Sequence, residues 1–130
     1  MVEFQSRILG IVDYPVAEGA ATRVFECELP SSVSMPYLSG QFAMISHPDV
    51  KLLGNPSALK WASYSISSSP LLKDRLEFCI GGGSPEGVSH RLMSLKEGDT
   101  ISVRGAFGKF ILDENAPEYV FLATGTGIAP

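Results

Sequence analysis

The sequence is poor in the residues that metal centres and disulfide frameworks require. It has two cysteines, Cys27 and Cys79, without a CxxC pair, and two histidines, His47 and His90. These are too few for a zinc cage or a disulfide framework, so we predict no metal site and interpret both histidines as surface residues. A reduced chain is the default expectation, which favours a cytoplasmic location.

Positive charge is also scarce, and long apolar runs are missing. Ten Lys and Arg residues stand against fourteen Asp and Glu residues, which gives a net charge of −4 and an isoelectric point near 5.1. Nucleic-acid binders usually carry a basic surface, so we expect no nucleic-acid partner. The N-terminal segment contains Glu3 and Arg7. We therefore predict neither a signal peptide nor a membrane span, and no membrane partner.

The composition that remains is that of one globular domain built from short segments. The 130 residues are 45% hydrophobic, and thirteen glycines and nine prolines interrupt them. In residues 22–29, Phe25, Cys27 and Leu29 alternate with more polar neighbours, as in a half-buried strand. Further strands are predicted at residues 8–12, 42–45, 64–67, 76–80 and 101–103. We expect an all-β fold, a six-stranded antiparallel Greek-key barrel rather than a sandwich, because closure removes exposed strand edges.

One short helix is predicted between the fifth and sixth of these strands. Residues 84–86, Ser-Pro-Glu, have the character of a helix start. Val88, Leu92 and Leu95 share one helical face, and Gly98 suits the end of the helix. Residues 52–60 show no periodicity and are predicted to form a loop.

The end of the chain has a different pattern. Residues 120–123 are a continuous apolar run, typical of a strand that is buried on both faces. A glycine-rich turn and a helix start come next, which is the opening of a nucleotide-binding α/β unit. We therefore divide the chain into a barrel domain, residues 1–115, and the first strand and turn of a second domain, residues 116–130.

Three stretches rich in glycine or serine are the candidate functional segments. Residues 61–70 alternate serines with Tyr64 and Ile66, giving a hydroxyl-lined face for a flat aromatic ligand. Composition alone slightly favours the alternative, a polar edge strand. Residues 81–89 form either a phosphate cradle before the helix or a linker. The third comprises residues 105–110 and 123–130, in which strand, glycine turn and helix start come in order.

Taken together, these stretches resemble the ferredoxin–NADP reductase superfamily over nearly the whole chain. The matching motifs are SYSISSSP, LEFCI with its glycine loop and GVSHRL, VRGAFGKF, and FLATGTGIAP. The resemblance implies the flavin-binding barrel of that family, followed by the start of its NAD(P)-binding domain. It implies FAD as cofactor, with FMN as a second possibility, and NAD(P)H delivered by a domain that these residues do not include.

The resemblance also implies roles for individual residues. Tyr64 would pack beside the isoalloxazine ring, and Ser65 would be the catalytic residue, hydrogen-bonding near flavin N5. The remaining cofactor contacts that it implies are Ile66, Ser67, Ile80, Gly87, Val88 and Ser89. Of these, Ser89 and the amides of Gly87 and Val88 would hold the phosphates. The nicotinamide and pyrophosphate side would be lined by Thr124, Gly125, Thr126 and Gly127.

Some positions depart from the family pattern. Ala62 stands where the family usually has Arg, and Gly81 where it often has Lys or Arg. The loop glycine, Gly87, lies two residues before Ser89 rather than three. Because a charge-assisted contact contributes about 1.5–3 kcal/mol, we expect weaker flavin binding or a preference for FMN. Arg91, His90, Lys60 or loop amides could compensate.

The function we expect is electron transfer between a nicotinamide cofactor and an acceptor. The chain would be the flavin side of a longer NAD(P)H-dependent oxidoreductase, inactive by itself, with a protein acceptor such as an iron–sulfur protein or a small-molecule acceptor. The alternative is a non-catalytic electron-transfer or interaction subunit with a weakened flavin site. A nucleic-acid-binding barrel is a third candidate, which the acidic isoelectric point disfavours.

Overall fold

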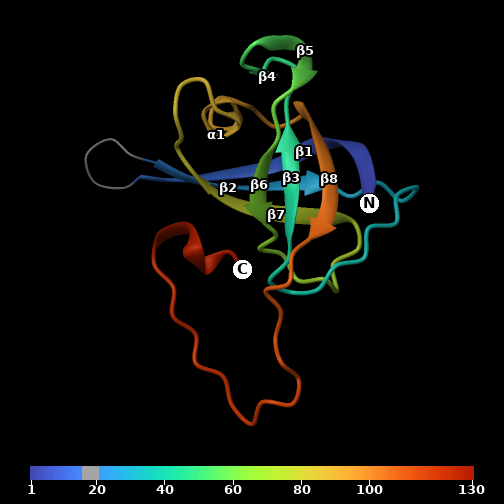
Figure 1. The fold of residues 1–130 in the computed structure, drawn as a ribbon, viewed down its shortest axis with the longest axis vertical. Helices are drawn as coiled ribbons and strands as arrows, with labels where there is room; N and C mark the ends of the chain where they lie inside the picture. Colours follow the sequence, from blue (N-terminus) through green and yellow to red (C-terminus); the bar gives the residue numbers. More distant parts are fainter. Residues whose placement is uncertain (16–20) are drawn as a thin grey trace.

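The computed structural model describes residues 1–15 and 21–130, and most of its regular structure is β-strand (Figure 1). One sheet has the strand order β6-β3-β8-β1-β2-β7. Its strands are β1 (Val2–Pro15), β2 (Ala21–Glu28), β3 (Phe42–Ser46), β6 (Ala62–Ser65), β7 (Arg75–Gly81) and β8 (Thr100–Phe107). The remaining elements are β4 (Lys51–Leu52), β5 (Asn55–Leu59), α1 (Val88–Leu92) and the 3-10 helix η2 (Gly125–Ile128).

The sheet curls into a nearly closed barrel. Every paired strand in it is antiparallel. The two end strands of the order, β6 and β7, are joined by a single bridge recorded between Ile66 and Phe78. The predicted fold class, an all-β antiparallel barrel of six strands with one short helix, is therefore confirmed.

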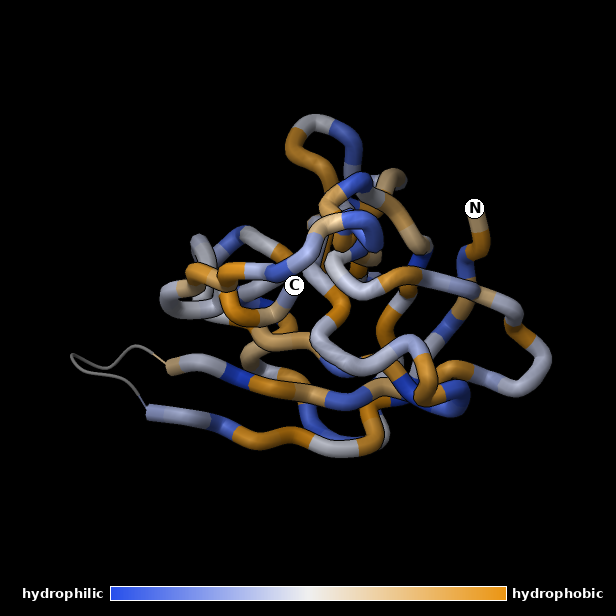
Figure 2. Tube along the Cα trace, turned by 90° about the horizontal axis from the view of Figure 1, so that it is seen from below, coloured by the Kyte–Doolittle hydropathy of each residue, from blue (hydrophilic) through white to orange (hydrophobic). Residues whose placement is uncertain are grey.

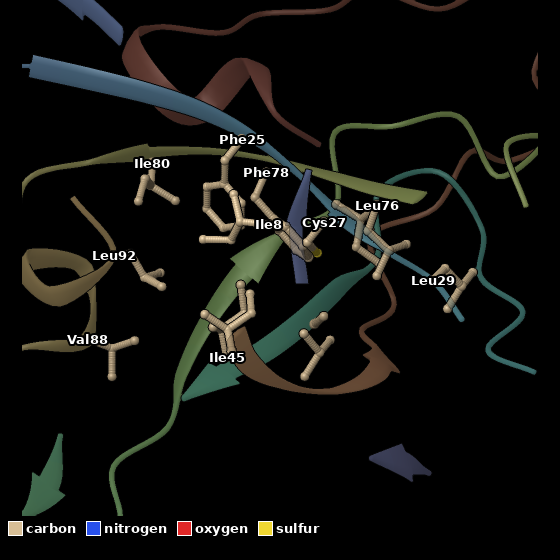
Figure 3. Close-up of a cluster of buried hydrophobic side chains, with 14 of the residues drawn as sticks. Ile8, Phe25, Cys27, Leu29, Ile45, Leu76, Phe78, Ile80, Val88 and Leu92 are labelled. Carbon is tan, nitrogen blue, oxygen red and sulfur yellow. The ribbon is translucent and has the colours of Figure 1, made fainter. Parts of the chain in front are cut away.

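The barrel interior holds the hydrophobic core. Phe25 of β2 and Phe78 of β7 lie at its centre, with ring centroids 5.5 Å apart. Val88 and Leu92 of α1 belong to the same cluster and extend it on the side of the helix (Figure 3). Apolar and polar segments alternate along the long strands, as Figure 2 shows. The period-two pattern in the sequence predicted this arrangement correctly.

The helix is shorter than predicted. Residues 84–86 do not start it, because the Ser84 carbonyl accepts the Gly87 amide at 2.8 Å and closes a turn that contains Pro85. The helix begins at Val88 with Gly87 as its N-cap. Leu95 lies beyond its end, although its side chain is buried as the pattern predicted. The described residues contain no helix that is both long and apolar enough to cross a membrane.

Residues 52–60 were predicted to form a loop, and this prediction is wrong. They form most of a two-stranded hairpin of β4 and β5. Lys51 pairs with Leu59, and Leu52 with Asn55. Gly54 makes the turn with a φ of +79°, a conformation that glycine adopts without strain. The hairpin carries exposed residues on both strands, so it has no apolar alternation to reveal it in the sequence.

The predicted strand at residues 120–123 does not form. The chain leaves the barrel after β8 in a long open loop, orange to red in Figure 1, that returns as η2. Val120, Phe121 and Leu122 are 82%, 76% and 93% exposed. A strand needs a hydrogen-bonded neighbour, and no described residue pairs with this segment.

Candidate functional site

The side chains of Tyr64 and Ser89 meet at one end of the barrel. Tyr64 comes from β6 and Ser89 from α1, and their hydroxyl oxygens lie 2.6 Å apart. The Tyr64 ring is half-buried and packs against the core. Burial raises the pKa of the Tyr64 hydroxyl, so it stays protonated near neutral pH. The two elements on which the predicted site depends therefore share one location.

Ser65 points away from Tyr64, because successive side chains on a strand face opposite sides. It pairs with Phe42 of β3, which pairs in turn with Phe107 of β8. The two phenylalanine rings have centroids 5.6 Å apart and are partly exposed. Tyr64 and Ser65 therefore place an aromatic ring and a hydroxyl on opposite faces of β6, the strand at one end of the sheet order.

The glycine run after β7 lets the chain pass close to the helix and to the terminal turn. A Cβ atom built on Gly83 would lie 3.0 Å from the Ser89 Cβ, tighter than side chains normally pack. A Cβ atom on Gly81 would lie 3.8 Å from the Thr126 methyl group of η2. The predicted stretches around Tyr64, Ser89 and Thr126 are thus brought together at one end of the molecule.

Arg23 of β2 fixes the helix to the barrel. Its guanidinium donates to the carbonyls of Leu92 at 3.0 Å and Leu95 at 2.7 Å, and to both carboxylate oxygens of Asp13 at 2.8 and 3.0 Å. The residue is 9% exposed. Sequence reasoning missed it, although an arginine on the same strand face as Phe25 and Cys27 was the available signal. Through α1, Arg23 sets the position of Ser89.

Several of the predicted contact residues can offer only their backbone. The side chains of Ile66, Ile80 and Val88 are each 2% exposed and belong to the core. The amide of Ile66 donates to the Gln41 carbonyl at 3.0 Å, and the Ser67 hydroxyl donates to Glu77 at 2.8 Å.

The predicted phosphate loop is partly engaged in its own turn. The Gly87 amide donates to the Ser84 carbonyl, so it is committed within the loop. Among the described residues, no acceptor is recorded for the amides of Val88 and Ser89, which begin the first helical turn. The terminal residues Thr124, Gly125 and Gly127 are exposed, as is Thr126.

A groove of about 460 Å³ lies between the β4–β5 hairpin and the loop before α1. Its charged and titratable lining residues are Asp49, Lys51, Lys60, Glu86, His90 and Arg91. Three cations therefore face two carboxylates, on a chain whose net charge is −4. Such a groove attracts anions locally. The sequence did not reveal it, because the hairpin that forms one wall was predicted to be a loop.

His47 comes directly after β3 at the rim of this groove and is 9% exposed, which corrects the prediction that it lies on the surface. Its Nδ1 accepts the Asp49 amide at 3.1 Å and the Arg91 Nε–H at 3.4 Å. Burial and the Arg91 charge lower the pKa of His47. His90, by contrast, is exposed as predicted. The burial of His47 is explained by the two donors that its ring satisfies.

These features fit a ligand that combines a flat aromatic ring with phosphate groups. Tyr64 and Ser65 offer an aromatic ring and a hydroxyl on β6, and neither side chain is fully buried. The glycine at position 83 lets the loop pass close to Ser89, which brings the helix start beside this strand. Amides of the first helical turn and a cation-lined groove adjoin them, and both favour phosphate. The class of protein that this barrel and site define is a nucleotide-cofactor-binding barrel.

Comparison with known proteins names the family. Residues 15–111 match the family described as the oxidoreductase FAD-binding domain. The chain belongs to that family. The resemblance to the ferredoxin–NADP reductase superfamily is thereby confirmed.

Individual relatives agree with this assignment. The chain is 33% identical to a cyanelle ferredoxin–NADP reductase of Cyanophora paradoxa, over 88% of this chain and 35% of the relative. It is 38% identical to the ferredoxin–NADP reductase of a Synechocystis strain, over 91% of this chain and 32% of the relative. The chain thus spans about a third of the length of these curated relatives.

A solved structure shows the same architecture. The ferredoxin–NADP+ reductase of Plasmodium falciparum with 2′P-AMP superposes with a TM-score of 0.71 and 27% sequence identity. The match covers 98% of this chain and 49% of that one. The similarity therefore extends past the end of β8 into the C-terminal tail.

Proposed function

We propose that this chain is the flavin-binding part of an NAD(P)H-dependent oxidoreductase that passes electrons between a nicotinamide cofactor and an acceptor. The observation that carries the proposal is the 2.6 Å contact between the Tyr64 and Ser89 hydroxyls. It joins the aromatic strand to the phosphate-binding loop, which are the two halves that a flavin nucleotide needs. Membership of the FAD-binding family supports the same cofactor.

FAD is the better candidate than FMN. FMN ends at one phosphate, whereas FAD carries a second phosphate and an adenosine. The groove beside α1 has room for those extra groups and presents Lys51, Lys60 and Arg91 to them. These cations would compensate for Ala62 and Gly81, where the family pattern has positive charge.

Tyr64 and Ser65 are the residues we propose to contact the reactive ring. FAD, when bound, would supply the redox chemistry that links a nicotinamide cofactor to an electron acceptor. Tyr64 would cover one face of the ring and exclude water from it. Ser65 would donate its hydroxyl proton as a hydrogen bond near N5, which orients the ring.

The terminal segment would complete the site from a second domain. We propose that residues 1–115 form the flavin-binding domain and residues 116–130 begin the NAD(P)-binding domain. The exposure of Val120, Phe121 and Leu122 is the expected state of a strand whose sheet partners belong to that domain. Thr124, Gly125, Thr126 and Gly127 would then line the nicotinamide and pyrophosphate side, because Thr126 already lies against Gly81.

The relatives and the thiols bear on the acceptor and the cellular location. Relatives named ferredoxin–NADP reductases favour an iron–sulfur protein as the acceptor, with a small molecule as the alternative. Cys27 and Cys79 are free, and burial raises the pKa of Cys27 to about 12, so that thiol is unreactive. Free thiols of this kind are compatible with a reducing compartment such as the cytoplasm.

Flavin titration tests the proposal. We expect the purified protein to bind FAD with a shift in the flavin absorbance bands and quenching of its fluorescence. Tyr64→Phe and Ser89→Ala, which remove one hydroxyl each, should each weaken binding several-fold. Tyr119→Phe makes the same chemical change on the exposed tail and should leave binding unchanged.

Two outcomes would contradict the proposal. If neither FAD nor FMN binds, the chain is better described as an interaction or electron-transfer subunit without a working flavin site. If flavin binds but Tyr64→Phe and Tyr119→Phe behave alike, the ligand lies elsewhere on the molecule.

A further inference from the structure

Arg91 occupies a defined place in the wall of the groove. Its Nη2 donates to the Asp49 carboxylate at 2.8 Å and its Nη1 to the Ser94 hydroxyl at 3.0 Å. Its Nε–H points to the His47 ring at 3.4 Å. A guanidinium has five N–H donors, and these three contacts leave two of them available to a ligand. Three partners thus hold the side chain in one orientation beside the groove.

His47 can hold Arg91 only if its Nδ1 accepts a hydrogen bond. Both groups that are hydrogen-bonded to this nitrogen, the Asp49 amide and the Arg91 Nε, are donors. The ring must therefore carry its proton on Nε2, since a hydrogen on Nδ1 would meet two other hydrogens. Protonation of His47 would break both contacts and set a positive ring beside the Arg91 guanidinium.

The charged groups around His47 determine how Arg91 responds when the ring is protonated. The Asp49 carboxylate lies 3.7 Å from Nδ1, close enough to turn toward a protonated ring and leave Arg91. Asp99, before β8, also favours the charged ring, whereas Arg91 opposes it. Loss of the Asp49 contact would free Arg91 from its present orientation.

We propose that His47 is a positioning residue that holds Arg91 in the orientation in which it binds the phosphate groups of the nucleotide, so that acid weakens this binding. The inference rests on the proposed flavin-binding function. It adds a specificity determinant, because Arg91 lines the groove assigned to the part of FAD that FMN lacks. The lowered pKa of His47 is consistent with a ring that is neutral in the working state.

Two substitutions at His47 separate positioning from packing. In His47→Asn the side-chain oxygen stands near the position of Nδ1, accepts hydrogen bonds and cannot be protonated. In His47→Ala the acceptor is lost. We expect His47→Ala to weaken FAD binding by about tenfold at pH 8, comparable to one charge-assisted contact, and His47→Asn to retain nearly the wild-type affinity. Binding of FMN should change little in either variant.

A pH series of FAD affinity supplies the second readout. In the wild type, the dissociation constant for FAD should rise several-fold between pH 8 and pH 5, and in His47→Asn it should stay nearly level. The exposed His90 also lines the groove and would contribute its own effect to the series. The wild type and His47→Asn are therefore also compared in a His90→Asn background, in which the same difference is expected, with thermal unfolding recorded for every variant.

The outcomes distinguish this inference from the function on which it rests. If the wild type binds no flavin, the proposed function fails and this inference fails with it. If the wild type binds FAD but His47→Asn keeps the wild-type pH profile, His47 does not position Arg91. The inference is also overturned if folded His47→Ala binds FAD as well as the wild type, or if FAD and FMN weaken equally.

Discussion

The barrel and the tail that comes after it contain similar apolar residues, but the barrel buries them and the tail leaves them exposed. Val103 of β8 is fully buried, whereas Val120 of the tail is 82% exposed. The difference lies in their hydrogen-bonded neighbours, because β8 is paired on both sides and the tail segment on neither. An apolar run therefore predicts that a segment can be buried. Whether it is buried in this structure depends on a neighbouring strand that pairs with it.

Paired substitutions of phenylalanine should give the largest contrast between the two regions. Phe78→Ala in the barrel core should reduce the free energy of unfolding by about 3–5 kcal/mol, because it leaves a cavity beside Phe25. Phe121→Ala in the tail should change it by less than about 0.5 kcal/mol. Urea denaturation of both variants measures the contrast. Similar losses would show that the tail is packed against the barrel.

The attachment of α1 should give the next largest effect. Arg23→Ala would remove the guanidinium donor from the Leu92 and Leu95 carbonyls, and we expect the free energy of unfolding to fall by about 2–3 kcal/mol. It should also weaken FAD binding, because Ser89 would shift with the helix. Arg23→Lys keeps the charge and one donor, so a smaller loss is expected. A loss of stability without any loss of FAD affinity would contradict the role of Arg23 in placing Ser89.

The hydroxyl contact between β6 and α1 should matter less for stability than for binding. Tyr64→Phe keeps the ring and removes one hydrogen bond, at a cost of about 1 kcal/mol or less. Chemical denaturation without flavin would measure this value. A cost much above that figure would mean that the contact serves the fold rather than the ligand.

The smallest expected effect is the dependence of stability on the His47 charge. The folded-state pKa of His47 lies below its ordinary value of 6.5, so the unfolded chain binds the proton more readily. Stability from this group is therefore present above pH 6.5 and is lost as the pH falls through the lowered value. Thermal unfolding should show this decline in the wild type and a weaker one in His47→Asn. Equal declines would exclude His47 as the cause.

Much of the barrel could be predicted from the sequence because its strands show their burial by alternation. Phe25 and Cys27, or Leu76 and Phe78, mark the inner face directly. The β4–β5 hairpin could not be predicted, since its residues are exposed or half-buried and do not alternate. The helix start at residues 84–86 was wrong because a Ser-Pro pair begins a turn as readily as a helix.

The candidate site was predicted in part. Local motifs identified Tyr64 and Ser89, but the short distance between them depends on barrel closure and on Arg23, which lies far away in the sequence. Arg91 was expected only as one of several compensating cations, and the contacts that it makes with His47 and Asp49 could not be predicted. These contacts join the turn after β3 to α1, more than 40 residues along the chain, and such a distance leaves no periodic signal.

The single bridge between Ile66 and Phe78 has a thermodynamic consequence. It joins the two strands that lead to the candidate site, so opening of the barrel along this line would also separate the groups that contact a ligand. Any ligand that binds only the closed form must oppose this opening by mass action. Amide hydrogens along β6 should therefore exchange with deuterium more slowly when FAD is present, while those in the middle of β1 and β2 exchange at the same rate in both states.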